Sequence, residues 1–167
     1  MPDPSPQALA AVEARPILAI DPGCDKSGVV RLDCGLVGDF NWLDNDAVAY
    51  AIKSLPKGSL VAIEWISSYG MTAGREMFDT CRWEARFEMV AGQCGHAVMR
   101  VLRRDVKRHL CENPSANDKA VNEAVRDRWG DKGTKKNPGG TYGFTDHTYA
   151  ALAVASYALD TAAGRVG

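Results

Sequence analysis

Two short apolar segments that each end in a carboxylate constrain the fold of this chain more than any other feature. Residues 17–20 read Ile-Leu-Ala-Ile and lead into Asp21, and residues 60–63 read Leu-Val-Ala-Ile and lead into Glu64. Short apolar runs bounded by turn residues are typical of buried strands. A carboxylate in such a place is unfavourable unless it is paired or binds a metal ion. Asp21 precedes Pro22-Gly23, so a simple turn is the alternative explanation for it.

The remaining apolar patterns predict an α/β domain with a mixed five-stranded sheet flanked by helices. The first strand continues into two more in an antiparallel meander, and a fifth strand follows a long helix. The further strands are expected at 29–34, 35–42 and 96–102, and the helices at 44–54, 72–93, 103–111, 118–129 and 145–162. Asp44 and Thr145 are the expected N-caps of the first and last helices. Residues 130–143 form a basic, glycine-rich loop.

The long helix at 72–93 carries more apolar residues than one core face needs. Spacings of three and four residues assign its core stripe to Phe78, Cys81, Ala85 and Met89. A second apolar face consists of Met77, Trp83, Phe87 and Val90. That face predicts either a homodimer interface or a helix buried on two sides within one chain.

Composition narrows the class of protein. With 167 residues, one domain at 16–167 is expected, after a disordered tail at 1–15. A net charge of −1 means that any contact with nucleic acid depends on a local basic patch. The five cysteines contain no CxxC pair, which argues against zinc or disulfides and favours free buried thiols in a reducing cytoplasm. No apolar run reaches the length of a membrane span, and residues 1–15 do not resemble a signal peptide.

Carboxylates at the ends of two neighbouring strands suit a hard divalent cation. Asp21 and Glu64 would meet at one sheet edge, where Mg²⁺ or Mn²⁺ relieves their repulsion. Asp146 or His147, in the first turn of the last helix, is the candidate third ligand. Asp146 also suits the helix dipole, and His147 also suits a solvated surface position. Two cations in a carboxylate cluster favour phosphodiester hydrolysis.

Basic residues flank these acids in three groups along the chain. Such residues position a nucleic acid through its phosphates without reading its sequence, although a charge run is also typical of a solvated helix face. The groups are Arg100, Arg103, Arg104, Lys107 and Arg108, then Lys119, Arg126 and Arg128, then Lys132, Lys135 and Lys136.

Several segments, in this order, resemble the RuvC family of Holliday-junction resolvases, in particular its phage and prophage members. The resemblance covers residues 17–158. It rests on residues 20–23 with 27–28, 63–64, 105–107, 117–121 and 150–155, and for the phage-type branch on 69–71, 78–81 and 133–139. It implies an RNase H-like fold, a homodimer formed through the helix at about 72–93, and nicking of four-way DNA junctions that depends on two Mg²⁺ or Mn²⁺ ions. It also implies a cytoplasmic protein, of phage or bacterial origin.

The resemblance assigns roles to individual residues. Asp21, Glu64 and His147 correspond to metal ligands, and Lys107 and Lys119 to phosphate contacts, with Lys119 a candidate catalytic residue. The family's last acid falls on Ala150, a departure for which Asp146 is the candidate substitute on the same helix face. Tyr69 is a candidate for stacking on an unpaired base, or a loop aromatic folded onto the surface. Arg104, Lys132, Lys135 and Lys136 complete the expected DNA-binding set.

Other functions compete with a junction resolvase. A nuclease of the same fold acting on branched replication forks or on RNA has similar motifs. Ala150 favours a junction-binding protein without catalysis. A sugar-kinase-type phosphotransferase shares the Asp-x-Gly strand and turn, but the chain is too short for two lobes and lacks a second phosphate loop.

Overall fold

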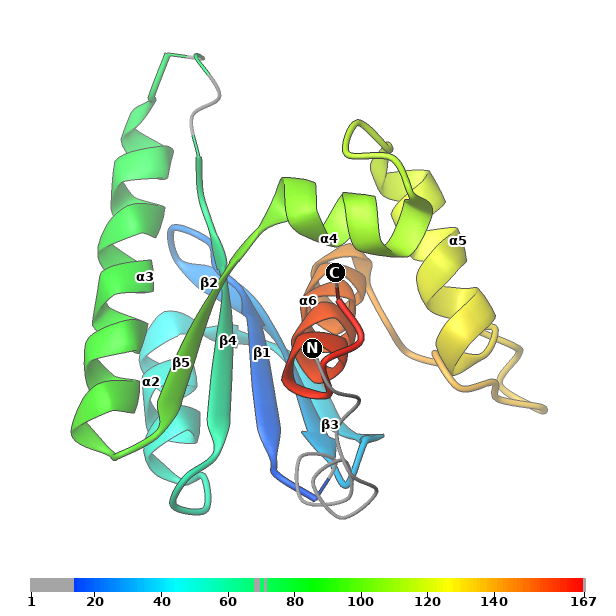
Figure 1. Ribbon diagram of the computed structural model, residues 1–167, viewed down its shortest axis with the longest axis horizontal. Coiled ribbons are helices and arrows are strands. Elements are labelled where there is room, and N and C mark those ends of the chain that lie inside the picture. The colour runs from blue at the N-terminus through cyan, green and yellow to red at the C-terminus, as the bar shows by residue number, and fades with distance from the viewer. Residues whose placement is uncertain (1–13, 68–69, 71, 167) are drawn as a thin grey trace.

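In the residues that the structure describes (14–67, 70 and 72–166), five strands form one mixed sheet (Figure 1). This structure is a computed structural model. The strands are β1 (Ile17–Asp21), β2 (Lys26–Asp33), β3 (Leu36–Asp44), β4 (Leu60–Trp65) and β5 (Ala97–Leu102). Their order across the sheet is β3-β2-β1-β4-β5. The α/β class, the antiparallel meander of the first three strands and the mixed sheet predicted from the sequence are confirmed.

The register of the two central strands brings their carboxylates to one edge. β1 and β4 run parallel, and Ile20 lies opposite Ile63. Asp21 and Glu64 each follow one residue later. Because side chains alternate between the two faces of a strand, both carboxylates lie on the face that holds Ala19 and Ala62.

Helices cover both faces of the sheet (Figure 1). One face packs against α2 (Asn45–Lys53) and α3 (Arg75–Gln93), and the other against α6 (Asp146–Ala162). α4 (Arg103–Cys111) and α5 (Asp118–Trp129) pack against α6 on its outer side. α4 and α5 match the residues predicted for them. None of the described helices is long and apolar enough to cross a bilayer.

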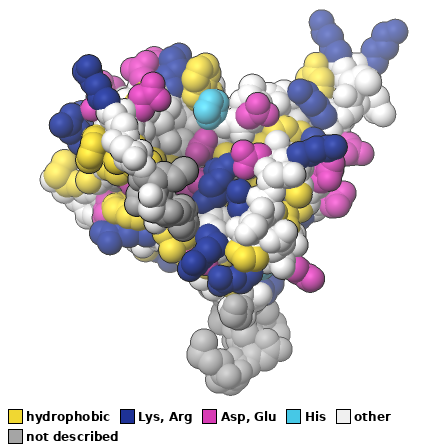
Figure 2. Space-filling view, turned by 90° about the horizontal axis from the view of Figure 1, so that it is seen from above, with side chains coloured by type: hydrophobic (Ala, Val, Ile, Leu, Met, Phe, Trp, Pro, Cys, Tyr) yellow, Lys and Arg dark blue, Asp and Glu magenta, His cyan; other side chains and the backbone are white. Residues whose placement is uncertain are grey.

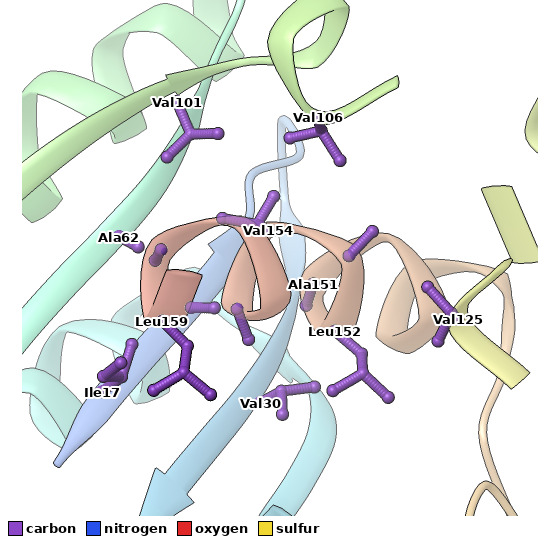
Figure 3. Close-up of a cluster of buried hydrophobic side chains, with 14 of the residues drawn as sticks. Ile17, Val30, Ala62, Val101, Val106, Val125, Ala151, Leu152, Val154 and Leu159 are labelled. Atoms are coloured by element: carbon purple, nitrogen blue, oxygen red, sulfur yellow. The ribbon is translucent and has the colours of Figure 1, made fainter. Parts of the chain in front are cut away.

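Two apolar cores lie on opposite faces of the sheet. The larger one joins the sheet to α6 and α5, and Figure 3 shows Ile17, Val30, Ala62 and Leu159 within it. On α6, the side chains of Leu152, Ala155 and Leu159 are all buried. The second core joins Leu18, Ile20, Val61 and Ile63 to α2 and α3. The central strands β1 and β4 are therefore buried on both faces, which fixes the positions of their ends.

The assignment of the two faces of α3 from the sequence is wrong. Its buried side chains are Thr80, Glu84, Phe87, Val90 and Ala91, whereas Phe78, Cys81, Ala85 and Met89 are exposed. Both faces have helical spacing, so periodicity alone does not say which one meets the sheet. α3 also begins at Arg75 rather than at residue 72.

The turn between β1 and β2 is held by buried polar side chains. Ser27 Oγ donates to Asn45 Oδ1 at 2.6 Å, and Asn45 Nδ2 donates to the Gly23 carbonyl at 2.9 Å. β2 begins at Lys26 rather than at residue 29. Asp44 occupies the N-cap position of α2 without a capping hydrogen bond from its side chain, and instead pairs with Lys26 at 3.4 Å.

The expectation of buried thiols is wrong for three cysteines. All five cysteines are free, as expected, but Cys24, Cys34 and Cys81 are exposed. They lie in turns or on the outer side of α3, where no core covers them.

Candidate active site

A cleft of about 540 Å³ opens at the carboxyl ends of β1 and β4, and we call it the sheet-edge cleft. Its walls come from β1, β4, α4, α5 and α6. The acidic and imidazole side chains that line it are Asp21, Glu64, Asp118, Asp146 and His147, and the basic ones are Arg103, Lys107, Lys119 and Arg126. Figure 2 looks down on this edge of the molecule, where dark blue and magenta side chains gather around a hollow.

Asp21 is a mostly buried carboxyl in the cleft, and its pKa is raised. Its side chain is 16 % exposed, and its Oδ2 lies 3.3 Å from Nδ1 of His147. Burial, with a smaller contribution from the charge of Glu64, raises the pKa of Asp21 to about 6, although His147 and Arg103 oppose the shift. A bound cation would stabilise the charged form of a carboxyl whose pKa is raised by burial and by a second acid.

Arg103 connects Glu64 to the opposite wall of the cleft. Its Nη1 donates to Glu64 Oε1 at 2.9 Å, and its Nη2 donates to Asp118 Oδ1 at 2.7 Å. Although burial lowers the pKa of Arg103, the charge of Glu64 and hydrogen bonds to both carboxylates raise it above its usual value. The hydrogen bond from Arg103 lowers the pKa of Asp118. Arg103 therefore remains charged and supplies a positive group beside Glu64.

The first turn of α6 reaches the cleft because β2 has no side chain beneath it. A Cβ on Gly28 would come far closer than 3.0 Å to the His147 carbonyl oxygen. Thr145 caps the helix, and its backbone N donates to Thr148 Oγ1 at 2.7 Å in a capping box. α6 thus begins at Asp146, as predicted, with Asp146, His147 and Ala150 all lining the cleft.

The chemistry of these donors suits a hard divalent cation, but the ligands are incompletely gathered. Carboxylate oxygens are the ligands that Mg²⁺ and Mn²⁺ prefer. Among the described residues, no group of three or more His, Cys, Asp or Glu side chains is arranged to hold a metal ion. The Arg103 guanidinium lies against Glu64 instead. Asp21 and Glu64 therefore fit such a cation in chemistry and burial, with Asp146 and His147 beside them in the same cleft.

The predicted DNA-binding residues separate into two groups. Lys107 and Lys119 line the cleft, and Lys107 Nζ lies 3.7 Å from Asp118 Oδ1. Arg104 is exposed on α4, outside the cleft lining. Lys132, Lys135 and Lys136 are exposed on a loop that carries a β-bridge between Gly133 and Pro138. Tyr69 lies outside the described residues, so its prediction stays open.

The sequence reasoning missed three residues around the site. Arg103 was grouped with the phosphate-binding bases, whereas it pairs with Glu64. Trp42, on β3, stacks on His147 with ring centroids 5.3 Å apart. Glu84, on α3, is 1 % exposed and accepts a hydrogen bond from the Ile66 backbone at 2.9 Å. A glutamate between apolar positions of a helix is a signal that could have identified Glu84. The contacts of Trp42 could not be identified in this way, because they depend on how β3 pairs with β2.

The chain has the fold of RuvC. No family model and no curated protein matches it. Among solved structures, Thermus thermophilus RuvC superposes with a TM-score of 0.65 and 18 % identity, over 90 % of this chain and 97 % of that chain. T. thermophilus RuvC in complex with Holliday junction substrate gives a TM-score of 0.64 and 16 % identity, over 90 % and 95 % of the two chains. The predicted RuvC-like, RNase H-like architecture is thereby confirmed.

Proposed function

We propose that this protein is a metal-dependent endonuclease that nicks four-way and other branched DNA junctions. One observation carries the proposal: Asp21 and Glu64 lie near the carboxyl ends of adjacent parallel strands, inside a cleft whose α4 and α5 walls bear basic residues. Paired carboxylates suit hydrolysis of a phosphodiester, and a basic rim suits a polyanionic substrate. The RuvC-like fold, which one similar structure presents with a Holliday junction, supports the choice of branched DNA.

Asp21 and Glu64 would hold Mg²⁺ or Mn²⁺ in this function, with Asp146 and His147 as further ligands for a second ion. Bound there, the ions would activate a water and stabilise charge on the attacking and leaving oxygens. Asp146 lies four residues before Ala150 on α6 and lines the same cleft. It is therefore the proposed replacement for the acid that the resemblance places at Ala150.

Arg103 and the lysines would supply positive charge around the reacting phosphate. When a cation binds at Glu64, Arg103 would either break its hydrogen bond to this carboxylate or share the carboxylate with the cation. Its hydrogen bond to Asp118 would remain. Lys107 and Lys119 line the cleft and would contact backbone phosphates, and Lys119 would also stabilise developing negative charge. Arg104, Lys132, Lys135 and Lys136 are exposed and would extend the contact along the DNA.

The protein would act as a homodimer, because a four-way junction presents two symmetry-related strands to cut. The proposed interface is the outer side of α3, where Phe78 is 57 % exposed and Met89 is 54 % exposed. This is the opposite side of the helix from the dimer face expected from the sequence, since Phe87 and Val90 are buried in the monomer.

Junction binding without cleavage is the second candidate function. Two observations favour it: Ala150 lines the cleft where the resemblance places an acid, and Arg103 neutralises Glu64. Binding by the basic residues does not need either carboxylate.

A cleavage assay on labelled DNA distinguishes these functions. The substrates are a four-way junction, a Y-shaped DNA and a linear duplex of matched arm sequence, each with Mg²⁺, Mn²⁺ or EDTA. We expect paired nicks in the junction with either metal and none with EDTA. Equal cutting of the Y-shaped DNA would indicate a general debranching nuclease, and tight binding without nicks in any metal would indicate a binding protein.

A further inference from the structure

An indole lies flat against the one imidazole that lines the sheet-edge cleft. The rings of Trp42 and His147 are 5.3 Å apart between centroids and inclined by only 5°. His147 is half-exposed, with 56 % of its side chain accessible, and Trp42 is 48 % exposed. An exposed side chain on the first turn of a helix ordinarily has several rotamers available. The contact with Trp42 therefore restrains a group that its own helix leaves free.

The backbone brings these two rings together through Gly28. Trp42 on β3 is the register partner of Gly28 on β2. Because Gly28 has no side chain, the His147 backbone rests directly on β2, in a space that a Cβ would fill. The first turn of α6 is thereby lowered onto the sheet beside the β3 position that carries the indole. Gly28 thus leaves the space that the His147 backbone fills, and its strand partner Trp42 supplies the ring beside the imidazole.

Other groups restrain both rings. His147 Nδ1 lies 3.3 Å from Asp21 Oδ2, so one edge of the imidazole faces the carboxylate. The Lys26 ammonium lies 5.0 Å from the centre of the Trp42 ring and 3.4 Å from Asp44 Oδ1. A cation near an indole is attracted by its π-system. Lys26 therefore helps to hold Trp42, and Trp42 in turn supports His147.

We propose that Trp42 is a positioning residue that fixes the imidazole of His147 with its Nδ1 edge toward Asp21. The inference rests on the proposed function for the role of His147, but its geometry is independent of that role. Contacts between aromatic rings contribute about 0.5–1.5 kcal/mol, so loss of the indole would lower the equilibrium constant for the aligned rotamer by about two- to tenfold. A site that needs His147 aligned would lose activity by up to that factor.

The imidazole signals of metal-free protein test this inference without any reaction. At one fixed pH, the ring current of Trp42 should displace the His147 ring-proton resonances in the ¹H–¹³C NMR spectrum, with His147→Asn identifying them. Trp42→Ala should remove the displacement, and Trp42→Phe should retain part of it. Tyr50→Ala is the matched control, because Tyr50 is a 72 % exposed aromatic on α2 that is not among the residues of the cleft.

Junction cleavage and junction binding provide the second readout. We expect Trp42→Ala to lower the cleavage rate by about two- to tenfold with unchanged junction affinity, and Trp42→Phe to recover most of it. Unchanged His147 resonances in Trp42→Ala would overturn the inference. If that variant also loses junction affinity, Trp42 contacts DNA by stacking on a base instead. If the wild-type protein cuts no DNA, the proposed function fails, whereas the NMR comparison still decides whether Trp42 positions His147.

Discussion

The charge of Asp21 separates catalysis from DNA binding in the proposed function. Asp21→Asn keeps the shape of the side chain and removes its negative charge, so a cation is no longer attracted to this position. We expect junction cleavage to fall by about a thousandfold, since bound metal lowers the barrier by several kcal/mol. Junction affinity, measured by gel shift in EDTA, should not fall, because it depends on the basic residues.

Asp39→Asn is the control for this substitution. Asp39 is an 89 % exposed carboxylate on β3 that lies near Arg31, and it is not among the residues that line the cleft. Its removal should leave both cleavage and binding unchanged. Loss of binding together with cleavage in Asp21→Asn would mean that Asp21 serves the fold rather than the reaction.

Glu84 makes the stability of the protein depend on pH. Burial, together with the charge of Glu64, raises the pKa of Glu84 to about 7 from an ordinary 4.5. A folded-state pKa above the unfolded value means that stability is fully present below about pH 4.5 and is lost as pH rises through about 7. Glu84→Gln keeps an acceptor for the Ile66 backbone N–H and removes the ionisation.

We therefore expect Glu84→Gln to be more stable than wild type at pH 8, by about 2–3 kcal/mol, and the difference to vanish near pH 4.5. Urea unfolding followed by circular dichroism across this range measures it. Glu88→Gln is the control, because Glu88 lies one turn along α3 in an exposed pair with Arg100. A difference between the Glu84 variant and wild type that does not change with pH would contradict the assignment.

Single residues also show how far sequence reasoning reaches. The alternation of side chains along a strand is strict, so the placement of Asp21 and Glu64 on one face follows once β1 and β4 are neighbours. The pairing of Glu64 with Arg103 could not be predicted in the same way. Arg103 begins α4, and its reach to Glu64 depends on the path of the chain after β5. Local patterns carry no information about that path.

The first turn of α6 and the strand beneath it form one unit at the scale of elements. Gly28→Ala would place a methyl group against the His147 backbone, far closer than 3.0 Å. Because both elements are rigid, the helix must move away from β2. We expect a loss of about 1–3 kcal/mol in the free energy of unfolding, as for other overpacked positions. The cleavage rate should fall by more than the loss of folded protein explains, because His147 and Asp146 move with the helix.

Gly92→Ala is the matched control for this change. Gly92 lies in α3 with open space around its Cα, so a methyl group meets nothing within 4 Å. Replacing a helical glycine by alanine stabilises by about 0.5–1 kcal/mol. The free energies of unfolding of the two variants, measured by chemical denaturation, should thus change in opposite directions. A Gly28→Ala protein as stable and active as wild type would show that α6 does not rest on β2 in this way.

Elements differed in how well their patterns predicted them. α4 and α5 match their predicted ranges, because turn residues at 112–117 separate the two helices and Gly130 ends α5. The existence of α3 was also predicted, but its two faces were exchanged. Glu84 interrupts the face that is truly buried, and helical periodicity favoured the uninterrupted apolar row instead. Burial of a charged side chain against the sheet is a tertiary effect that a spacing rule does not contain.

The oligomeric state belongs to the whole molecule, and the outer side of α3 should determine it. Lysines in place of Phe78 and Met89 would put charge into the proposed interface and leave the core of the monomer intact. We expect the double variant to run as a monomer in size-exclusion chromatography with light scattering, and wild type as a dimer. Tyr50→Lys, on the exposed side of α2, should remain dimeric. A dimeric double variant would locate the interface elsewhere.

The salt dependence of DNA binding in the proposed function is also a property of the whole surface. Lys119 lines the cleft with 83 % of its side chain exposed and only a 4.0 Å contact to Glu123. Lys119→Ala should weaken junction binding and reduce the slope of log K against log salt by about one. Fluorescence anisotropy across a salt series measures this slope, with Lys57→Ala in a remote exposed turn as the control. An unchanged slope would remove Lys119 from the phosphate contacts.

The order of the strands along the chain determines when the parts of the cleft become available during translation. Asp21 is made early, but its neighbour strand β4 follows only after β2, β3 and α2, and His147 lies 126 residues further along the chain. At ordinary rates of translation that interval lasts about 6 to 25 seconds. In the proposed function, the site of a nascent chain is therefore incomplete until α6 has left the ribosome and packed against the sheet. A chain that stops before α6 would lack Asp146 and His147, so the proposed function predicts that it cuts no DNA.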